Sequence, residues 1–340
     1  MSVAGWLADR VGWKGIEASL AAHRASRRGF MFHVGGITLF LLVVQVVSGI
    51  LLAIYYRPDA DHAHASVERI VGEIPYGNLV RGVHVWAADL FVVSLLIHLF
   101  TVVVRRSFRA PHELTWVSGI ALLLVGLGQA FTGAVLPWSE KAYTDARVGS
   151  EFARYVPLVG DWLHRFMRGG EDVDSETLAH AFGFHVAVLP AAMTLLLGTH
   201  LFLVSRRPVT PLPQAATAPT IPLYPDFLVR LGVALTGTMV LILSLAIFWE
   251  RPVGPSADPR TPPSGGLPPW YLLPAHAILR AAPKELLGID GPTFLFGAAC
   301  VFGLILLALP FIDRRGSRLT VWLAWIALLA LILLSFRALP

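Results

Sequence analysis

Four histidines stand in pairs inside two long apolar stretches of this 340-residue chain, His84 with His98 and His185 with His200. The members of the first pair are 14 residues apart, and those of the second pair are 15 apart. In a helix such gaps span about 21–22 Å, and both side chains of a pair fall near one face. An imidazole is costly inside a bilayer unless it coordinates a metal or pairs with another polar group. Each pair therefore indicates two ligand positions at two depths of one membrane helix.

The composition is that of an integral membrane protein. Charged residues make up 14% of the chain, hydrophobic residues make up 55%, and the mean hydropathy is +0.65. Soluble domains average about 25% charged residues. The predicted fold is all-α, with a four-helix bundle followed by three further transmembrane helices. The seven apolar runs long enough to span lie at 32–56, 83–104, 114–136, 181–204, 228–249, 293–312 and 319–336.

Basic residues concentrate in alternate connections, which predicts the topology. The N-terminal tail and the connections after the second, fourth and sixth runs are rich in arginine. The positive-inside rule then places the N-terminus in the cytoplasm and, after seven spans, the C-terminus outside. The net charge of +5 is explained by this asymmetry and does not indicate a nucleic-acid partner. The single cysteine, Cys300, excludes a C-x-x-C-H haem attachment site.

The second and fourth runs are separated by one span, so they cross the membrane in the same direction. His84 and His185 then share the outer level, and His98 and His200 share the inner level. Two such helices can hold two haems, one above the other. Ligation of iron by two imidazoles leaves no open position, which suits electron transfer rather than oxygen chemistry.

Two glycine pairs repeat the histidine spacing. Gly35 and Gly49 lie 14 apart in the first run, and Gly119 and Gly133 lie 14 apart in the third. This register predicts that each macrocycle meets a neighbouring helix at a residue without a side chain. Close packing of small residues between membrane helices is the alternative explanation.

The chain divides into two membrane blocks. We expect a cytoplasmic amphipathic or flexible segment at 1–29, a dihaem domain at 30–206, a Pro-rich cytoplasmic linker at 207–225, and a three-helix domain at 226–340. A Pro-rich outer loop at 251–292 lies within the second block.

Several motifs resemble the cytochrome b subunit of quinol:cytochrome c oxidoreductases, the cytochrome bc complexes. The first block is most similar to the short chloroplast type, and here it is fused to the C-terminal block. The motifs are GGITLF at 35–40, VQVVSG at 44–49, YYRP at 55–58, ASVERI at 65–70, YGNLVRGVH at 76–84, HELTWVSG at 112–119, FTGAVLPW at 131–138, VPLVGDWL at 156–163 and WYLLPAHAILR at 270–280.

The resemblance implies two b haems and two quinone sites on opposite sides of the membrane. Quinol would give one electron to a Rieske iron–sulfur protein and one to the outer haem, and the inner haem would reduce quinone near the cytoplasmic face. Protons would be released outside and taken up inside. A c-type cytochrome, a homodimeric complex and a bacterial inner membrane are further implications.

The outer quinol site departs from the family pattern. Where the family usually has Pro-Glu-Trp-Tyr, this chain reads Pro268, Pro269, Trp270, Tyr271, so the usual proton-accepting Glu is absent. We expect His276 to accept the proton, since its ordinary pKa suits the task, with Asp145 as the second candidate. A packed imidazole and a solvated carboxylate are the alternatives. The altered motif favours a lower-potential quinol such as menaquinol.

The resemblance also implies roles for other polar residues. Arg81, one turn before the outer ligand, would pair with a haem propionate. Ser205, Arg206 and Arg207 follow the inner ligand, where a quinone or propionate would lie, although Arg206 and Arg207 also fit simple topology signals. His33 stands where the chloroplast type carries a cysteine for a third haem. An ordinary interfacial histidine is favoured over a third haem there.

Several residues receive no site assignment from the sequence. Asp89, inside the second span, is a functional candidate without an assigned role. His62, His64, His112 and His164 are expected at the surface of connections.

Two other functions fit parts of the pattern. A dihaem anchor subunit that exchanges electrons between a peripheral enzyme and quinone would need the histidine pairs, but not the Trp270–Tyr271 loop. A cofactor-free transporter or structural subunit would leave four membrane histidines without partners, which is energetically unfavourable.

Overall fold

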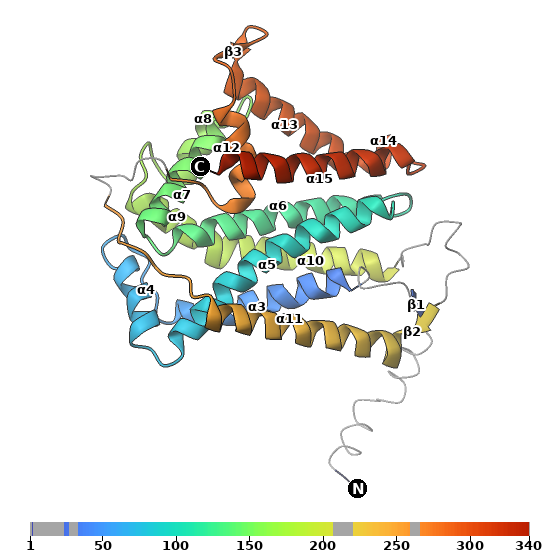
Figure 1. Ribbon diagram of the computed structural model, residues 1–340, viewed down its shortest axis with the longest axis horizontal. Coiled ribbons are helices and arrows are strands. Elements are labelled where there is room, and N and C mark those ends of the chain that lie inside the picture. The colour runs from blue at the N-terminus through green and yellow to red at the C-terminus, as the bar shows by residue number, and fades with distance from the viewer. Residues whose placement is uncertain (1, 3–23, 27–32, 207–219, 259–265, 340) are drawn as a thin grey trace.

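The computed structural model describes residue 2 and residues 24–26, 33–206, 220–258 and 266–339. Within them it is a bundle of long helices, as the sequence predicts (Figure 1). Most of the expected 1–29 segment and positions 207–219 of the expected linker lie outside the described residues. The first-block helices are α3 Val34–Ala53, α4 Ala63–Gly72, α5 Gly77–Val104, α6 Glu113–Val135, α7 Glu140–Arg154, α8 Gly160–Arg168, α9 Ser175–Gly183, the π-helical turn η2 Phe184–Val188, and α10 Leu189–Arg206.

The second block continues the bundle. Its helices are η4 Leu223–Phe227, α11 Leu228–Phe248, η5 Trp270–Leu272, α12 Leu273–Arg280, α13 Gly291–Leu307, α14 Leu309–Ile312 and α15 Arg318–Ala338. Short antiparallel strands pair β1 Arg24–Ser26 with β2 Thr220–Pro222 and β3 Glu285–Leu286 with β4 Ile289–Asp290.

Six helices of the described chain are long and apolar enough to cross a membrane. They correspond to all the predicted spans except the run at 293–312. That run forms α13, which has 17 residues, or about 25 Å of helix, against a hydrocarbon core of about 30 Å. A break at Ala308 then separates α13 from the one-turn helix α14.

The short helices gather at one end of the bundle. In Figure 1 the labels α4, α7, α8, α9 and α12 lie at one end of the long helices, and α14 with β1 and β2 lies at the other. We call these the α7 end and the β1 end. Side-chain caps define the polar starts of several helices, with Ser139 beginning α7 and Asp174 beginning α9 through a capping box.

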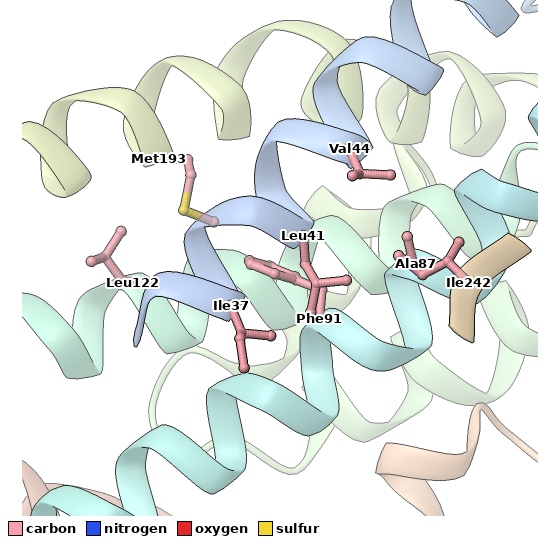
Figure 2. Packing of buried hydrophobic residues seen from close by; sticks show 8 residues of the cluster. All are labelled: Ile37, Leu41, Val44, Ala87, Phe91, Leu122, Met193 and Ile242. Atoms are coloured by element: carbon pink, nitrogen blue, oxygen red, sulfur yellow. The ribbon is translucent and has the colours of Figure 1, made fainter. Parts of the chain in front are cut away.

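An apolar layer fills the middle of the bundle (Figure 2). Leu41 from α3, Phe91 from α5 and Met193 from α10 are all buried in it. In sequence, Phe91 lies midway between His84 and His98, and Met193 lies about midway between His185 and His200. The hydrophobic layer therefore separates the level of His84 and His185 from the level of His98 and His200. Its members are Ile37, Leu41, Val44, Ala87, Phe91, Leu122, Met193 and Ile242.

Candidate functional site: two imidazole pairs and a loop pocket

The structure brings His84 and His185 together near the α7 end. Their ring centroids lie 6.4 Å apart, and their planes are inclined at 79°. Two metal–imidazole bonds of about 2 Å, plus about 1.1 Å from each nitrogen to its ring centre, would separate the centroids by about 6 Å. The observed separation therefore fits one metal ion held between the two rings, as a bis-imidazole haem requires.

His98 and His200 form the second level, toward the β1 end of α5 and α10. The two side chains lie near each other. The pair His84–His185 therefore lies toward the α7 end and the pair His98–His200 toward the β1 end. This is the order expected for two helices that cross the membrane in the same direction.

The spacing difference between the two histidine pairs has a structural explanation. His185 lies in η2, a π-helical turn inside the continuous helix Ser175–Arg206. A π-turn takes one more residue than an α-turn and is frequent at functional sites. The extra residue absorbs the difference between 15 and 14, so both members of the second pair face the same neighbours. The 14-against-15 mismatch was a visible signal of this turn in the sequence.

Each histidine ring lies against one of the four predicted glycines. A Cβ atom built at the glycine would lie 2.6 Å from His185 at Gly133, 3.2 Å from His84 at Gly49, 3.2 Å from His98 at Gly35 and 3.4 Å from His200 at Gly119. The nearest atom is the imidazole Cε1 in all four cases. The glycines therefore leave room for the imidazole rings, and the expectation that they also make room for macrocycles stays a prediction.

A hydroxyl residue immediately before three of the glycines contacts the same ring. Ser48 Oγ lies 2.9 Å from Nδ1 of His84, and Ser118 Oγ lies 2.9 Å from Nδ1 of His200. Thr132 Oγ1 lies 3.2 Å from Nδ1 of His185. These hydroxyl residues were not predicted, although the Ser-Gly and Thr-Gly pairs are visible in the sequence.

These hydroxyl groups determine which ring nitrogen is left for a metal. Each one donates its hydrogen to a carbonyl of its own helix, as Ser48 does to Val44 O at 2.6 Å. The hydroxyl oxygen is then left to accept from the imidazole Nδ1–H. This tautomer leaves the Nε2 lone pair free, and such a hydrogen bond also orients a metal-binding ring. Val34 occupies the corresponding position before Gly35.

A second cluster surrounds the start of α12 and the middle of α7. Asp145 is only 4% exposed, and Lys141 Nζ donates a hydrogen bond to its carboxylate. Burial raises the pKa of Asp145 to about 6, although Lys141 acts in the opposite direction. The alternative interpretation of Asp145 as a solvated loop charge is therefore wrong.

Tyr271 and His276 lie beside this carboxylate region. The Tyr271 hydroxyl is buried without a hydrogen-bond partner among the described residues, and its pKa is raised by burial and by the nearby Asp145 and Asp89. His276 is half-buried and packs against Phe152 of α7, with ring centroids 6.3 Å apart. Burial and Arg280 lower the pKa of His276. Pro268 and Pro269, which precede Trp270 in the chain, are both buried.

Arg81 is directed toward the second block. Its Nη1 donates to the Arg251 carbonyl at 2.5 Å. The expected pairing of Arg81 with a haem propionate stays a prediction.

The structure brings the candidate residues at the β1 end together less closely than those at the α7 end. Ser205 and Arg206 are exposed at the end of α10, where the Arg206 guanidinium lies 5.1 Å from the Phe202 ring centre. Arg207 lies outside the described residues. His33 stacks on Phe227 with centroids 4.7 Å apart, and its buried Nε2 has no hydrogen-bond partner among the described residues.

Three histidines expected at the surface are buried instead. His64, His112 and His164 are 8%, 6% and 1% exposed, whereas His62 is exposed as expected. His64 and His164 are buried because their connections fold into the helices α4 and α8, whereas His112 is the residue at which α6 begins. His164, for example, lies 3.2 Å from Glu151 of α7.

Comparison with known families gives matches over both blocks. The model of the family described as cytochrome b/b6/petB matches residues 22–207, and that described as cytochrome b(C-terminal)/b6/petD matches residues 256–339.

Individual proteins show the same similarity. The cytochrome bc complex cytochrome b subunit of Chlorobaculum thiosulfatiphilum is 35% identical over 324 residues, which cover 93% of this chain and 74% of that protein. The menaquinol:cytochrome c reductase cytochrome b subunit of Geobacillus thermodenitrificans is 36% identical over 190 residues, or 56% of this chain and 84% of that protein. A solved structure described as a hyperthermophilic respiratory Complex III has the same fold, with a TM-score of 0.87 and 24% identity over 99% of this chain and 92% of that one.

Proposed function

Because this chain belongs to the cytochrome b family, we propose that it is the membrane subunit of a cytochrome bc complex that oxidises quinol on one side of the membrane and reduces quinone on the other. It carries electrons between the two sides through two b haems and couples this transfer to proton translocation. The α7 end faces outside, and the β1 end faces the cytoplasm. Of the two electrons of each quinol, one enters the outer haem, and the other passes to a Rieske protein and a c-type cytochrome.

The observation that carries this proposal is the 6.4 Å separation of the His84 and His185 rings. These residues hold the outer haem, and His98 with His200 holds the inner one. When bound, the haems supply one-electron redox chemistry, which protein side chains alone cannot provide. The chain itself orients the ligands, through glycines against the ring edges and hydroxyls at Nδ1.

At the outer quinol site we assign the proton acceptor to Asp145. A general base works best when its pKa lies near the operating pH, and a pKa of about 6 meets this condition. His276 was the favoured candidate from the sequence, but its pKa is lowered by burial and by Arg280, which makes it a weaker base than an ordinary histidine. Tyr271 contributes an unpartnered hydroxyl beside Asp145 that can hydrogen-bond a quinol oxygen.

The inner quinone site is placed at the β1 end. Ser205 and Arg206 stand at the end of α10, one to two turns after His200, and Arg207 follows them in the sequence. Positive charge there suits a quinone that takes up protons from the cytoplasm. The menaquinol named for the Geobacillus relative agrees with the altered Pro268–Tyr271 motif, so menaquinol is the proposed substrate, and a homodimer is the proposed assembly.

A redox-titrated absorbance spectrum of the purified complex tests the assignment, with its subunits identified by mass spectrometry. We expect two b-type components per chain and a co-purifying Rieske protein. His84→Leu or His185→Leu should remove one component, and His98→Leu or His200→Leu the other. His62→Leu, at an exposed position, is the matched control. A colourless protein would contradict the proposal. Two haems without a Rieske partner or quinol:cytochrome c activity would favour the non-bifurcating anchor.

A further inference from the structure

Asp89 joins the haem-bearing helix to two separate segments of the second block. It lies on α5, five residues after His84. Its Oδ2 accepts a hydrogen bond from Arg251 Nη2 at 2.7 Å, and its Oδ1 accepts one from Trp270 Nε1 at 2.8 Å. Arg251 follows α11, whereas Trp270 begins η5, so one carboxylate connects segments 162 and 181 residues away in the chain.

Two further contacts hold Arg251, and a third holds the neighbouring Trp249. Its guanidinium lies 4.0 Å from the Trp86 ring centre, a favourable cation–π arrangement. Its backbone carbonyl accepts from Arg81 at 2.5 Å. The Trp86 indole also donates to the Trp249 carbonyl at 2.9 Å. The outer third of α5 therefore fixes both the backbone and the side chain of the segment that leaves α11.

The ion pair itself is partly accessible, with 41% of the Arg251 side chain and 27% of the Asp89 side chain exposed. Partly exposed ion pairs contribute little to stability. A carboxylate that accepts from two donors in defined directions nevertheless restrains both donors. The arrangement is therefore better suited to fixing geometry than to stabilising the fold.

The restrained indole is adjacent in the chain to Tyr271, the residue proposed to hydrogen-bond the quinol. The Trp270 and Tyr271 rings pack edge to face, with centroids 5.6 Å apart at 85°. The position of Trp270 therefore determines where the buried Tyr271 hydroxyl lies relative to Asp145. Without the bond from Trp270 to Asp89, this loop would lose its direct side-chain link to the helix of His84.

We infer that Asp89 is a positioning residue of the outer quinol site, which holds the Trp270–Tyr271 loop at a set place on the helix that carries His84. The inference rests on the proposed quinol oxidation. It assigns a role to a residue that neither touches the haem ligands nor accepts the proton.

Steady-state kinetics of the purified complex with a decyl-substituted menaquinol analogue test this inference. Asp89→Ala removes both hydrogen bonds, and Trp270→Phe removes one from the loop side without altering a membrane helix. We expect KM for the quinol to rise about 10-fold in either variant, the scale of one lost charge-assisted hydrogen bond, with kcat within about 3-fold. Asp89→Asn keeps an acceptor for the indole and should restore part of the KM.

Haem spectra and a double-mutant cycle separate positioning from a general structural defect. Both haem components should keep their amounts and potentials in the Asp89 and Trp270 variants. Asp89→Ala with Trp270→Phe should be no worse than the more affected single variant, because the two changes remove the same contact. Asp290→Asn, at the exposed cap of α13, is the control and should leave KM unchanged.

The possible failures are distinguishable. An unchanged KM in both single variants, or a haem loss that parallels the loss of activity, would overturn the role of Asp89 while leaving the proposed function intact. A wild-type complex that oxidises no quinol would overturn the proposed function first, whatever the variants do.

Discussion

Gly133 and His185 approach so closely that a Cβ atom at residue 133 would lie 2.6 Å from the imidazole Cε1. The same virtual contact is 3.4 Å between Gly119 and His200. The first separation is shorter than van der Waals contact allows, and the second is ordinary contact. An added methyl group would therefore displace His185 from Gly133 much more than it would displace His200 from Gly119.

Gly133→Ala should displace His185 and cause loss of the outer haem, whereas Gly119→Ala should leave the inner haem largely bound. The reason is that a methyl group forces the ring away at residue 133 but barely touches it at residue 119. Haem content per chain, measured from reduced-minus-oxidised spectra, checks this prediction. Equal haem loss in the two variants would contradict it.

Ser48→Ala should raise the midpoint potential of the outer haem by tens of millivolts. The bond from His84 Nδ1 to Ser48 Oγ makes the imidazole a stronger donor, which favours oxidised iron. Loss of a bond worth about 1 kcal/mol corresponds to about 40 mV for a one-electron couple. Potentiometric titration measures the change. Thr38→Val, which removes a hydroxyl that donates to Val34 O in the same helix, should not shift the potential.

Asp145→Asn should lower quinol oxidation by about 10²- to 10⁴-fold, the usual contribution of a general base. In the wild type the carboxylate is protonated as the pH falls through about 6, so the rate should decline below that pH. The variant should lack this acidic limb. The measurement is kcat/KM as a function of pH, with His276→Gln as the comparison. Loss of the limb in His276→Gln but not in Asp145→Asn would reverse the assignment.

Lys141→Met should move the acidic limb toward higher pH. Lys141 lowers the pKa of Asp145 by its charge and its hydrogen bond, so its removal leaves burial to raise that pKa further. Less of the carboxylate is then ionised at a given pH, and the rate at pH 6–7 should fall. The control is Lys284→Met, a lysine outside this pocket. An unshifted or acid-shifted limb would show that Asp145 is not the titrating group.

Features that repeat along one helix were visible in the sequence. The depth of the histidine pairs, the matching glycines and the all-α membrane fold follow from periodicity and hydropathy, which depend only on residues close in the chain. The order of histidines along α5 and α10 follows from counting spans. Even the π-turn at His185 had a local signal, since one pair is spaced by 15 residues and the other by 14.

Contacts between distant segments were decided only by tertiary structure. Asp89 meets Arg251 and Trp270 across 162 and 181 residues, and no local pattern encodes such a meeting. The burial of Asp145, which raises its pKa, and of His164 arises because α7 and α8 pack on the bundle end instead of forming a solvated loop. Helical periodicity is a property of neighbouring residues, whereas desolvation and side-chain pairing depend on which surfaces the folded chain brings together.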